Sequence, residues 1–137
     1  MSEAEIIESL FSIYDRYWTI VQWWSSVSFS LIIVAYLAAD RLNKGIVATL
    51  LGLYSLYTVW VYLLMAYNVN MAVALLADLE SLRIAGSLQS QGALVTLQDK
   101  LPEYGTRLGS VALLATFIAC VGYFLYAYRE TRKSANT

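Results

Sequence analysis

The hydrophobic pattern of the chain is dominated by three long stretches without a charged residue, 17–39, 45–77 and 108–128. A helix needs about 20 apolar residues to cross about 30 Å of hydrocarbon, so each stretch is long enough to span a bilayer. An unpaired charge at the bilayer centre costs at least about 2.5 kcal/mol, which makes such uninterrupted stretches informative. The pattern predicts an all-α integral membrane protein with transmembrane helices at 18–39, 46–67 and 109–128.

Residues 2–17 form an amphipathic pattern that leads into the first span. Ile6, Leu10 and Ile13 recur at helical spacing. Ser2 and Glu5 have the spacing of a capping box, in which each side chain accepts a hydrogen bond from the backbone of the other residue. We therefore expect a helix from the N-terminal region to residue 39. The short link 40–45 then makes the first two spans an antiparallel hairpin.

The second charge-free stretch would be about 50 Å long as a helix, more than one bilayer requires. Beyond the span, Ala72, Leu75 and Leu79 continue a helical stripe, so we expect this helix to reach residue 85. We assign 86–98 to a turn or connection, 99–132 to a helix that includes the third span, and 133–137 to a tail. In this interpretation Asp99 caps the last helix; the alternative is one helix from about 92, kinked near 98–102.

These lengths predict that all three helices extend beyond the bilayer on one side as a helical bundle. The apolar residues of the extensions need partners, and the neighbouring helices are the nearest ones. The alternative is that 2–16 and 70–85 lie flat on the membrane as interfacial helices.

Composition supports lipid as the solvent. The chain is 59% hydrophobic and 14% charged, whereas soluble domains are about 45–50% apolar and about 25% charged. It has no His and one Cys, which excludes His-ligated metals, His-based catalysis and an intrachain disulfide. We expect Cys120 to be a small buried packing residue. The nine basic residues are dispersed at a net charge of −1, so we expect no nucleic-acid partner. We also expect no cofactor and no metal.

The basic residues also predict an orientation. The link and the C-terminal tail hold five basic residues in a short length of chain: Arg41, Lys44, Arg129, Arg132 and Lys133. The N-terminal segment and the 68–108 connection hold four in a much longer length. The positive-inside rule then places the link and the tail in the cytoplasm and the N-terminus and 68–108 outside, as in a bacterial-type inner membrane.

Two rows of residues within the spans are candidate functional features. Gln22, Ser26 and Ser30 form a polar row, each four residues from the next. They can line a pore or hydrogen-bond to neighbouring helices. A stripe of small residues in the third helix allows close helix packing, with a shorter patch on the second helix. The two sets are Gly105, Gly109, Ala112, Ala115, Thr116, Ala119 and Gly122, and Ala48, Gly52 and Ser55.

The stripe can meet the other two helices or another copy of the chain. No span contains Asp, Glu, Lys or Arg, which counts against a pump or an ion-coupled carrier. We therefore expect a non-catalytic membrane protein, not an enzyme, that works through helix–helix contacts as a structural or regulatory subunit of a membrane complex. Its expected partners are membrane lipid and other membrane chains or copies of itself. The alternative is a self-assembling homo-oligomeric pore or channel.

Overall fold

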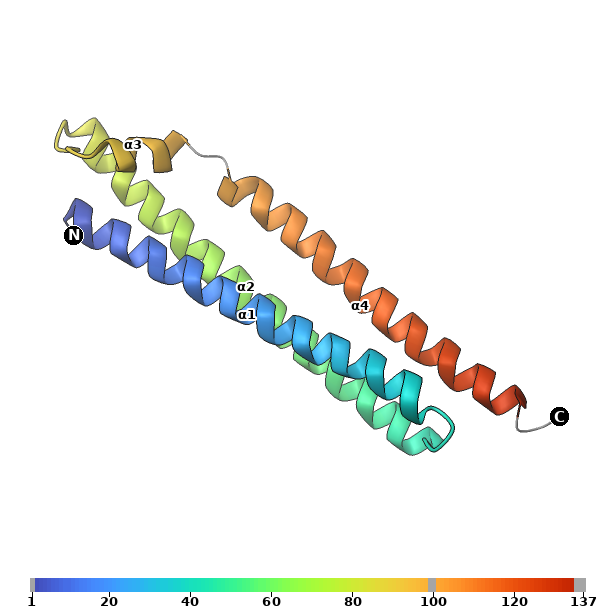
Figure 1. Ribbon diagram of the computed structural model, residues 1–137. Helices are drawn as coiled ribbons and strands as arrows, with labels where there is room; N and C mark the ends of the chain where they lie inside the picture. Colours follow the sequence, from blue (N-terminus) through green and yellow to red (C-terminus); the bar gives the residue numbers. More distant parts are fainter. Residues whose placement is uncertain (1, 99–100, 135–137) are drawn as a thin grey trace. The chain divides into compact units, whose positions relative to one another are not determined.

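The structure, a computed structural model, describes residues 2–98 and 101–134; the side chains of 101–107 and 134 lie outside this description. The described chain is helical, with α1 (Glu3–Ala38), α2 (Lys44–Ile84), α3 (Gln91–Gln98) and α4 (Leu101–Ser134) (Figure 1). Three helical segments are long and apolar enough to cross a membrane: α1, α2 and Leu108–Lys133 of α4. The predicted all-α class with three candidate spans is confirmed.

The helix ends follow local capping chemistry. The Ser2 backbone N–H donates to Glu5 Oε2 at 2.7 Å and the Glu5 N–H donates to Ser2 Oγ at 3.4 Å, which confirms the capping box. The Ser2 backbone hydrogen bond lowers the pKa of the Glu5 carboxyl. At the start of α2, Asn43 Oδ1 accepts a hydrogen bond from the Ile46 N–H at 2.8 Å. After α2, Gly86 has a φ of 69°, a left-handed conformation that glycine adopts without steric cost.

The connection assigned to 86–98 differs from the structure, because residues 91–98 form the helix α3. Ser90 caps this helix: its Oγ accepts a hydrogen bond from the Ala93 N–H at 3.1 Å. Ala93 is fully buried, so packing stabilises this helix, which begins close to residue 92, where the alternative interpretation places a helix start. The predicted cap Asp99 lies outside the described residues. Pro102 occupies the first turn of α4, where its missing N–H removes no helical hydrogen bond.

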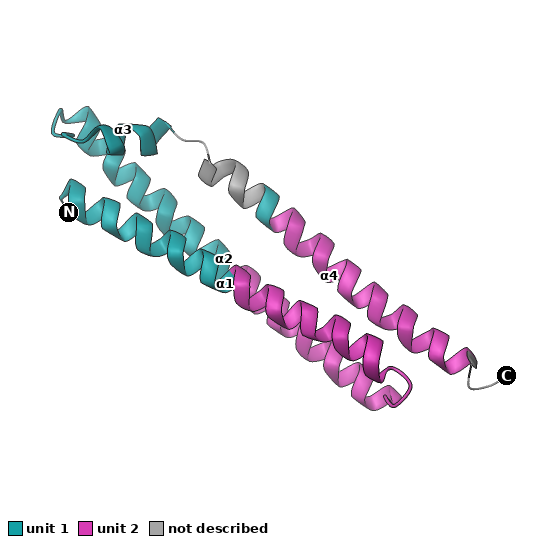
Figure 2. Ribbon diagram, in the orientation of Figure 1, with its two compact units in different colours: residues 1–20, 63–109 teal, residues 21–62, 110–137 magenta. Residues whose placement is uncertain are grey.

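The chain divides into two compact units (Figure 2). Unit 1 comprises Met1–Ile20 and Leu63–Gly109. Its core is aliphatic and joins α1, α2 and α3. The Glu3 carboxylate also accepts the backbone N–H groups of Gln89 at 2.8 Å and Ser90 at 3.0 Å, which ties the start of α1 to the turn before α3. The core residues are Ile6, Leu10, Ile13, Ala72, Leu75, Leu79 and Ala93.

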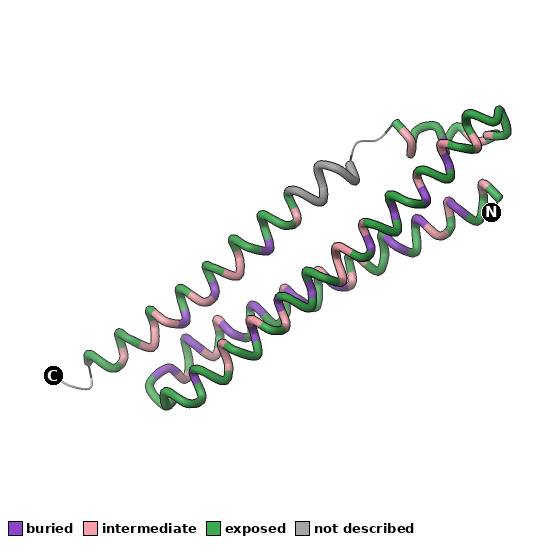
Figure 3. The backbone as a smooth tube through the Cα atoms, turned by 180° about the vertical axis from the view of Figure 1, so that it is seen from behind, coloured by how far each residue is buried: buried purple, intermediate pink, exposed green. Residues whose placement is uncertain are grey.

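Unit 2 comprises Val21–Tyr62 and Ser110–Thr137. In it, segments of α1, α2 and α4 share one core, made by Leu31, Ala35, Val47, Tyr54, Cys120 and Phe124. Buried positions recur along one side of each helix (Figure 3). Large apolar side chains cover the outside: Phe29 is 66%, Leu56 68% and Ile118 61% exposed. Such an outer surface suits lipid rather than water.

Candidate functional site

The core of unit 2 contains a layer of polar side chains that join two helices. Trp24 Nε1 on α1 donates to Thr58 Oγ1 on α2 at 3.4 Å. One turn further along α1, the hydroxyl groups of Ser28 and Tyr54 are 2.9 Å apart and share a hydrogen bond. All four residues are buried. In hydrocarbon such interhelical bonds contribute about 0.6 kcal/mol on average, so the layer holds α1 against α2.

The helix α4 contributes side chains to the same layer. Cys120 on α4 is buried, as expected for a packing residue, and its Sγ lies 3.9 Å from the Ser28 carbonyl oxygen, to which it donates. The rings of Phe117 and Tyr54 stack at 5.5 Å between centroids with an interplanar angle of 17°. The polar layer therefore contains hydroxyl, indole and thiol groups and holds three helices together.

The residues of this layer could have been found from the phase of the amphipathic extensions. Continuing the Ile6–Leu10–Ile13 stripe in steps of three and four leads to Trp24 and Ser28. The stripe of Leu79, Leu75 and Ala72 leads backward in the same way to Thr58 and Tyr54. Serine content alone pointed instead to Gln22, Ser26 and Ser30, which belong to a different face.

The predicted polar row lies outside the core of unit 2. Gln22, Ser26 and Ser30 are all exposed. Ser26 Oγ donates to the Gln22 carbonyl oxygen at 2.9 Å and Ser30 Oγ donates to the Ser26 carbonyl oxygen at 2.8 Å. The hydroxyl protons of Ser26 and Ser30 are thus used within α1.

The small-residue stripe of α4 also faces mostly outward. Ala112, Ala115, Ala119 and Gly122 are exposed, while Thr116 is half-buried and donates to the Ala112 carbonyl oxygen at 2.8 Å. The inward side of the helix is formed instead by Leu113, Phe117, Cys120 and Phe124. The exposed members of the stripe therefore form a face of α4 that no other described residue of this chain covers.

The remaining small residues have different surroundings. A Cβ at Gly109 would lie 2.6 Å from Tyr17 Oη, so this glycine lets the tyrosine approach α4 in unit 1. The side-chain surroundings of Gly105 lie outside the described residues. On α2, Ala48 and Gly52 are exposed, and a Cβ at Gly52 meets no described atom within 4 Å. Ser55 is half-buried, and its Oγ donates to the Leu51 carbonyl oxygen at 2.7 Å.

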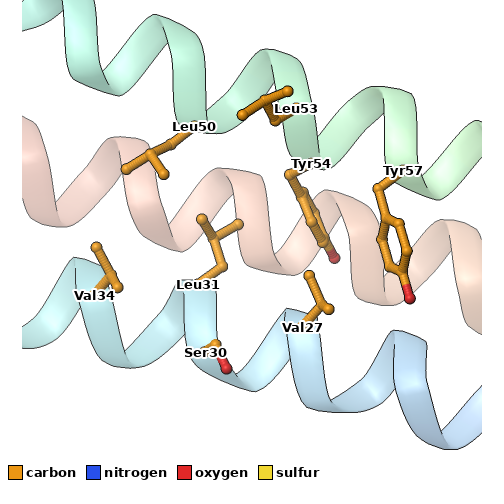
Figure 4. A pocket seen from close by; sticks show the side chains of 8 residues that line it. All are labelled: Val27, Ser30, Leu31, Val34, Leu50, Leu53, Tyr54 and Tyr57. Atoms are coloured by element: carbon orange, nitrogen blue, oxygen red, sulfur yellow. The ribbon is translucent and has the colours of Figure 1, made fainter.

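An open groove of about 310 Å³ lies between α1 and α2 in unit 2 (Figure 4). From α1 it is lined by Val27, Ser30, Leu31 and Val34. From α2 it is lined by Leu50, Leu53, Tyr54 and Tyr57. The oxygen atoms of Ser30 and Tyr54 already make hydrogen bonds within the chain. The lining therefore presents hydrocarbon and ring surfaces.

Two buried polar atoms have no hydrogen-bond partner within the described part of the chain, Asn68 Oδ1 and Tyr128 Oη. Asn68 is 3% exposed and its Nδ2 donates to the Leu64 carbonyl oxygen at 2.8 Å. An unpaired buried carbonyl oxygen costs about 1–3 kcal/mol.

No group of three or more His, Cys, Asp or Glu side chains that could hold a metal ion occurs among residues 2–98 and the described side chains of α4. Comparison with protein-family models, with curated proteins and with solved structures finds no match to this chain. The helix surfaces and the groove are therefore the features from which a function can be inferred.

Proposed function

We propose that this chain is a non-catalytic membrane protein that acts through helix–helix contacts as a structural or regulatory subunit of a membrane complex. The outward small-residue face of α4 carries this proposal. Ala112, Ala115, Ala119 and Gly122 lie on one exposed side of a charge-free helical stretch. Small residues allow the backbone of another helix to approach closely and gain dispersion contacts, where no hydrophobic force acts between helices in lipid.

The chemistry of the interior supports a role without catalysis. The polar layer of unit 2 consists of neutral groups that bond to one another or to the backbone. The Asp, Glu, Lys and Arg residues of the sequence lie outside 17–39, 45–77 and 108–128, the stretches that contain the predicted spans. A site for acid–base chemistry would need such groups inside a pocket.

Extraction from the native membrane tests the subunit proposal. A tagged full chain is purified in a mild detergent and its native mass is measured. We expect a mass that includes a different chain besides the 15.3 kDa protein. The double variant Ala115→Leu, Ala119→Leu should lose that chain, because two bulky side chains keep the partner helix away. A stable, homogeneous assembly of this chain alone would overturn the proposal.

The matched control for this experiment is Leu114→Phe. Leu114 is 58% exposed on the same helix and is already large, so a larger ring there leaves the small-residue face intact. We expect this variant to retain the partner. Equal loss of the partner in both variants would mean that α4 tolerates no surface change, which contradicts a contact made through its small residues.

A self-assembling pore is a second candidate function. The outward position of Gln22, Ser26 and Ser30 supports it, because several copies can bring these rows together around a lumen. Dye leakage from liposomes that contain the purified chain tests this candidate. Leakage should fall in the variant Ser26→Leu. Absence of leakage, or leakage equal in the variant, removes the pore.

The proposed location is a bacterial-type inner membrane, with the link 40–45 and the C-terminus in the cytoplasm. The support is the excess of basic residues in the link and the tail. Single cysteines placed at Asn43 and Ser87 in a Cys120→Ala background test the orientation. A membrane-impermeant maleimide added to intact cells should label Ser87→Cys only; labelling of Asn43→Cys alone would reverse the orientation.

A further inference from the structure

We infer that the groove between α1 and α2 binds one acyl chain of an anionic phospholipid, whose phosphate lies against the basic side chains at the link 40–45. This inference is independent of the proposed partner of α4. It rests on two observations within unit 2: the shape and chemistry of the groove, and the charge at the end of the groove nearest the link.

The walls of the groove suit an acyl chain better than a helix. Leu31, Val34 and Leu50 and the ring of Tyr57 provide long, branched or aromatic surfaces (Figure 4). No glycine or alanine lines the groove, whereas close packing of a further helix favours small residues. Of the three lining hydroxyl groups, those of Ser30 and Tyr54 are already hydrogen-bonded, which leaves the Tyr57 hydroxyl as a single polar group in an otherwise apolar groove (Figure 4).

The depth of the groove also suits an acyl chain. Val34 is six residues from Asp40 and Leu50 is six residues from Lys44, which is about 9 Å along a helix. Val27 and Tyr57 lie about 10 Å deeper. The groove thus runs from the link side to about the middle of a hydrocarbon core about 30 Å thick, the depth that the acyl chains of that leaflet occupy.

Positive charge gathers at the link. Arg41 is 85% exposed and has Asp40 as its neighbour at 3.9 Å, and Lys44 is exposed at the start of α2. A third cation comes from α4: Arg132 Nη2 donates to the Leu42 carbonyl oxygen at 3.4 Å, while its guanidinium stacks 5.2 Å from the centre of the Tyr128 ring. Three basic groups against one carboxylate favour an anionic headgroup over a zwitterionic one.

Native mass spectrometry of the full chain in detergent tests the inference. The protein is mixed with equal amounts of dioleoyl phosphatidylglycerol and dioleoyl phosphatidylcholine, which share acyl chains and differ in headgroup charge. We expect the phosphatidylglycerol adduct to dominate by about 25-fold, since the link has an excess of two basic groups and each strengthens binding of an anionic lipid by about fivefold. Equal adducts of the two lipids would overturn the assignment of the headgroup.

Two pairs of variants separate the headgroup from the acyl chain. Arg41→Gln with Lys44→Gln should remove the preference for phosphatidylglycerol. Arg16→Gln with Arg83→Gln, which removes two basic charges from unit 1, should keep it. Leu53→Trp should fill the groove and reduce both adducts, while Leu56→Trp, on an exposed residue outside the groove, should not.

Leu53 is 60% exposed, so a larger side chain there leaves the core untouched; circular dichroism verifies that each variant is folded. Adducts that are the same in Leu53→Trp and Leu56→Trp would overturn the groove as the binding site. A dimer of the chain that disappears only in Leu53→Trp would assign the groove to a second copy and would also overturn the inference. Neither result bears on loss of a partner in the α4 variants.

Discussion

The two units of this chain use their polar residues in opposite ways. Unit 1 buries aliphatic side chains and exposes its charged groups, for example the ion pair in which Arg83 Nε donates to Glu80 Oε2 at 2.9 Å. Unit 2 buries hydrogen-bonded hydroxyl and indole groups and exposes Phe29, Leu56 and Ile118. Unit 1 also exposes large apolar side chains, among them Phe11 and Ile84, so the two units differ in the polar groups that they bury and in their exposed charges. Exposed charges suit water, whereas neutral side chains that hydrogen-bond internally suit a segment in lipid.

The largest expected effect comes from a charge placed on the outer surface of each unit. Leu56→Asp in unit 2 should oppose insertion of α2 by about 2.5–3.5 kcal/mol, because lipid cannot solvate the carboxylate. Val73→Asp in unit 1, also an exposed apolar residue, should cost less than about 0.5 kcal/mol in water. The apparent free energy of membrane insertion and the free energy of unfolding in detergent are measured for both variants. A free-energy cost in Val73→Asp equal to that in Leu56→Asp would place the extension of α2 in lipid and contradict the difference between the two units.

Asn68 in unit 1 gives the next effect. Asn68→Leu should raise the free energy of unfolding by about 1 kcal/mol, because it removes the buried Oδ1 that lacks a partner among the described residues. Asn70→Leu, at an exposed position, serves as the control and should change stability little. Denaturant unfolding in mild detergent measures both variants. A loss of stability in Asn68→Leu would show that Oδ1 has a partner and that unit 1, too, depends on an internal polar bond.

The interhelical bond of unit 2 gives a smaller effect. Tyr54→Phe removes the bond between the hydroxyl groups of Ser28 and Tyr54, yet Ser28 Oγ keeps its bond to the Trp24 carbonyl oxygen at 2.9 Å. The expected loss is therefore about 0.6 kcal/mol. Tyr36→Phe, at a residue that is 75% exposed, should lose nothing. Equal unfolding of the two variants would remove the polar layer as a source of stability in unit 2.

The contrast also explains what the sequence could predict. Charge-free stretches predict the three candidate spans because burying charge in lipid is costly at every position. The capping box predicts the start of α1 because Ser2 and Glu5 act locally. The inward side of a span is harder to predict, since lipid and protein core are both apolar. Small size therefore did not predict burial at Ala112 or Ala119.

The helix α3 shows a second limit. Its core residue Ala93 is buried by side chains of α1 and α2 that lie far away in the sequence. The polar residues of 86–92 are typical of a turn, while the apolar residues that follow favour the alternative of a helix from about 92. Burial within a third element and the Ser90 cap decide the outcome instead.

The smallest expected effect is a pH dependence confined to the first turn of α1. The pKa of the Glu5 carboxyl is lowered in the folded chain, first by the backbone N–H of Ser2 and then by the Ser2 side chain. A lowered pKa means that the ionised form stabilises the cap. The contribution is complete above the ordinary pKa range of Glu and is lost as the pH falls through the lowered value. The protection of first-turn amides against exchange, measured relative to the intrinsic exchange rate at each pH, should therefore fall in acid, while the protection of amides in unit 2 stays constant. In Glu5→Gln the first turn should exchange at a rate that no longer follows this titration; an unchanged acid response there would assign it to another group.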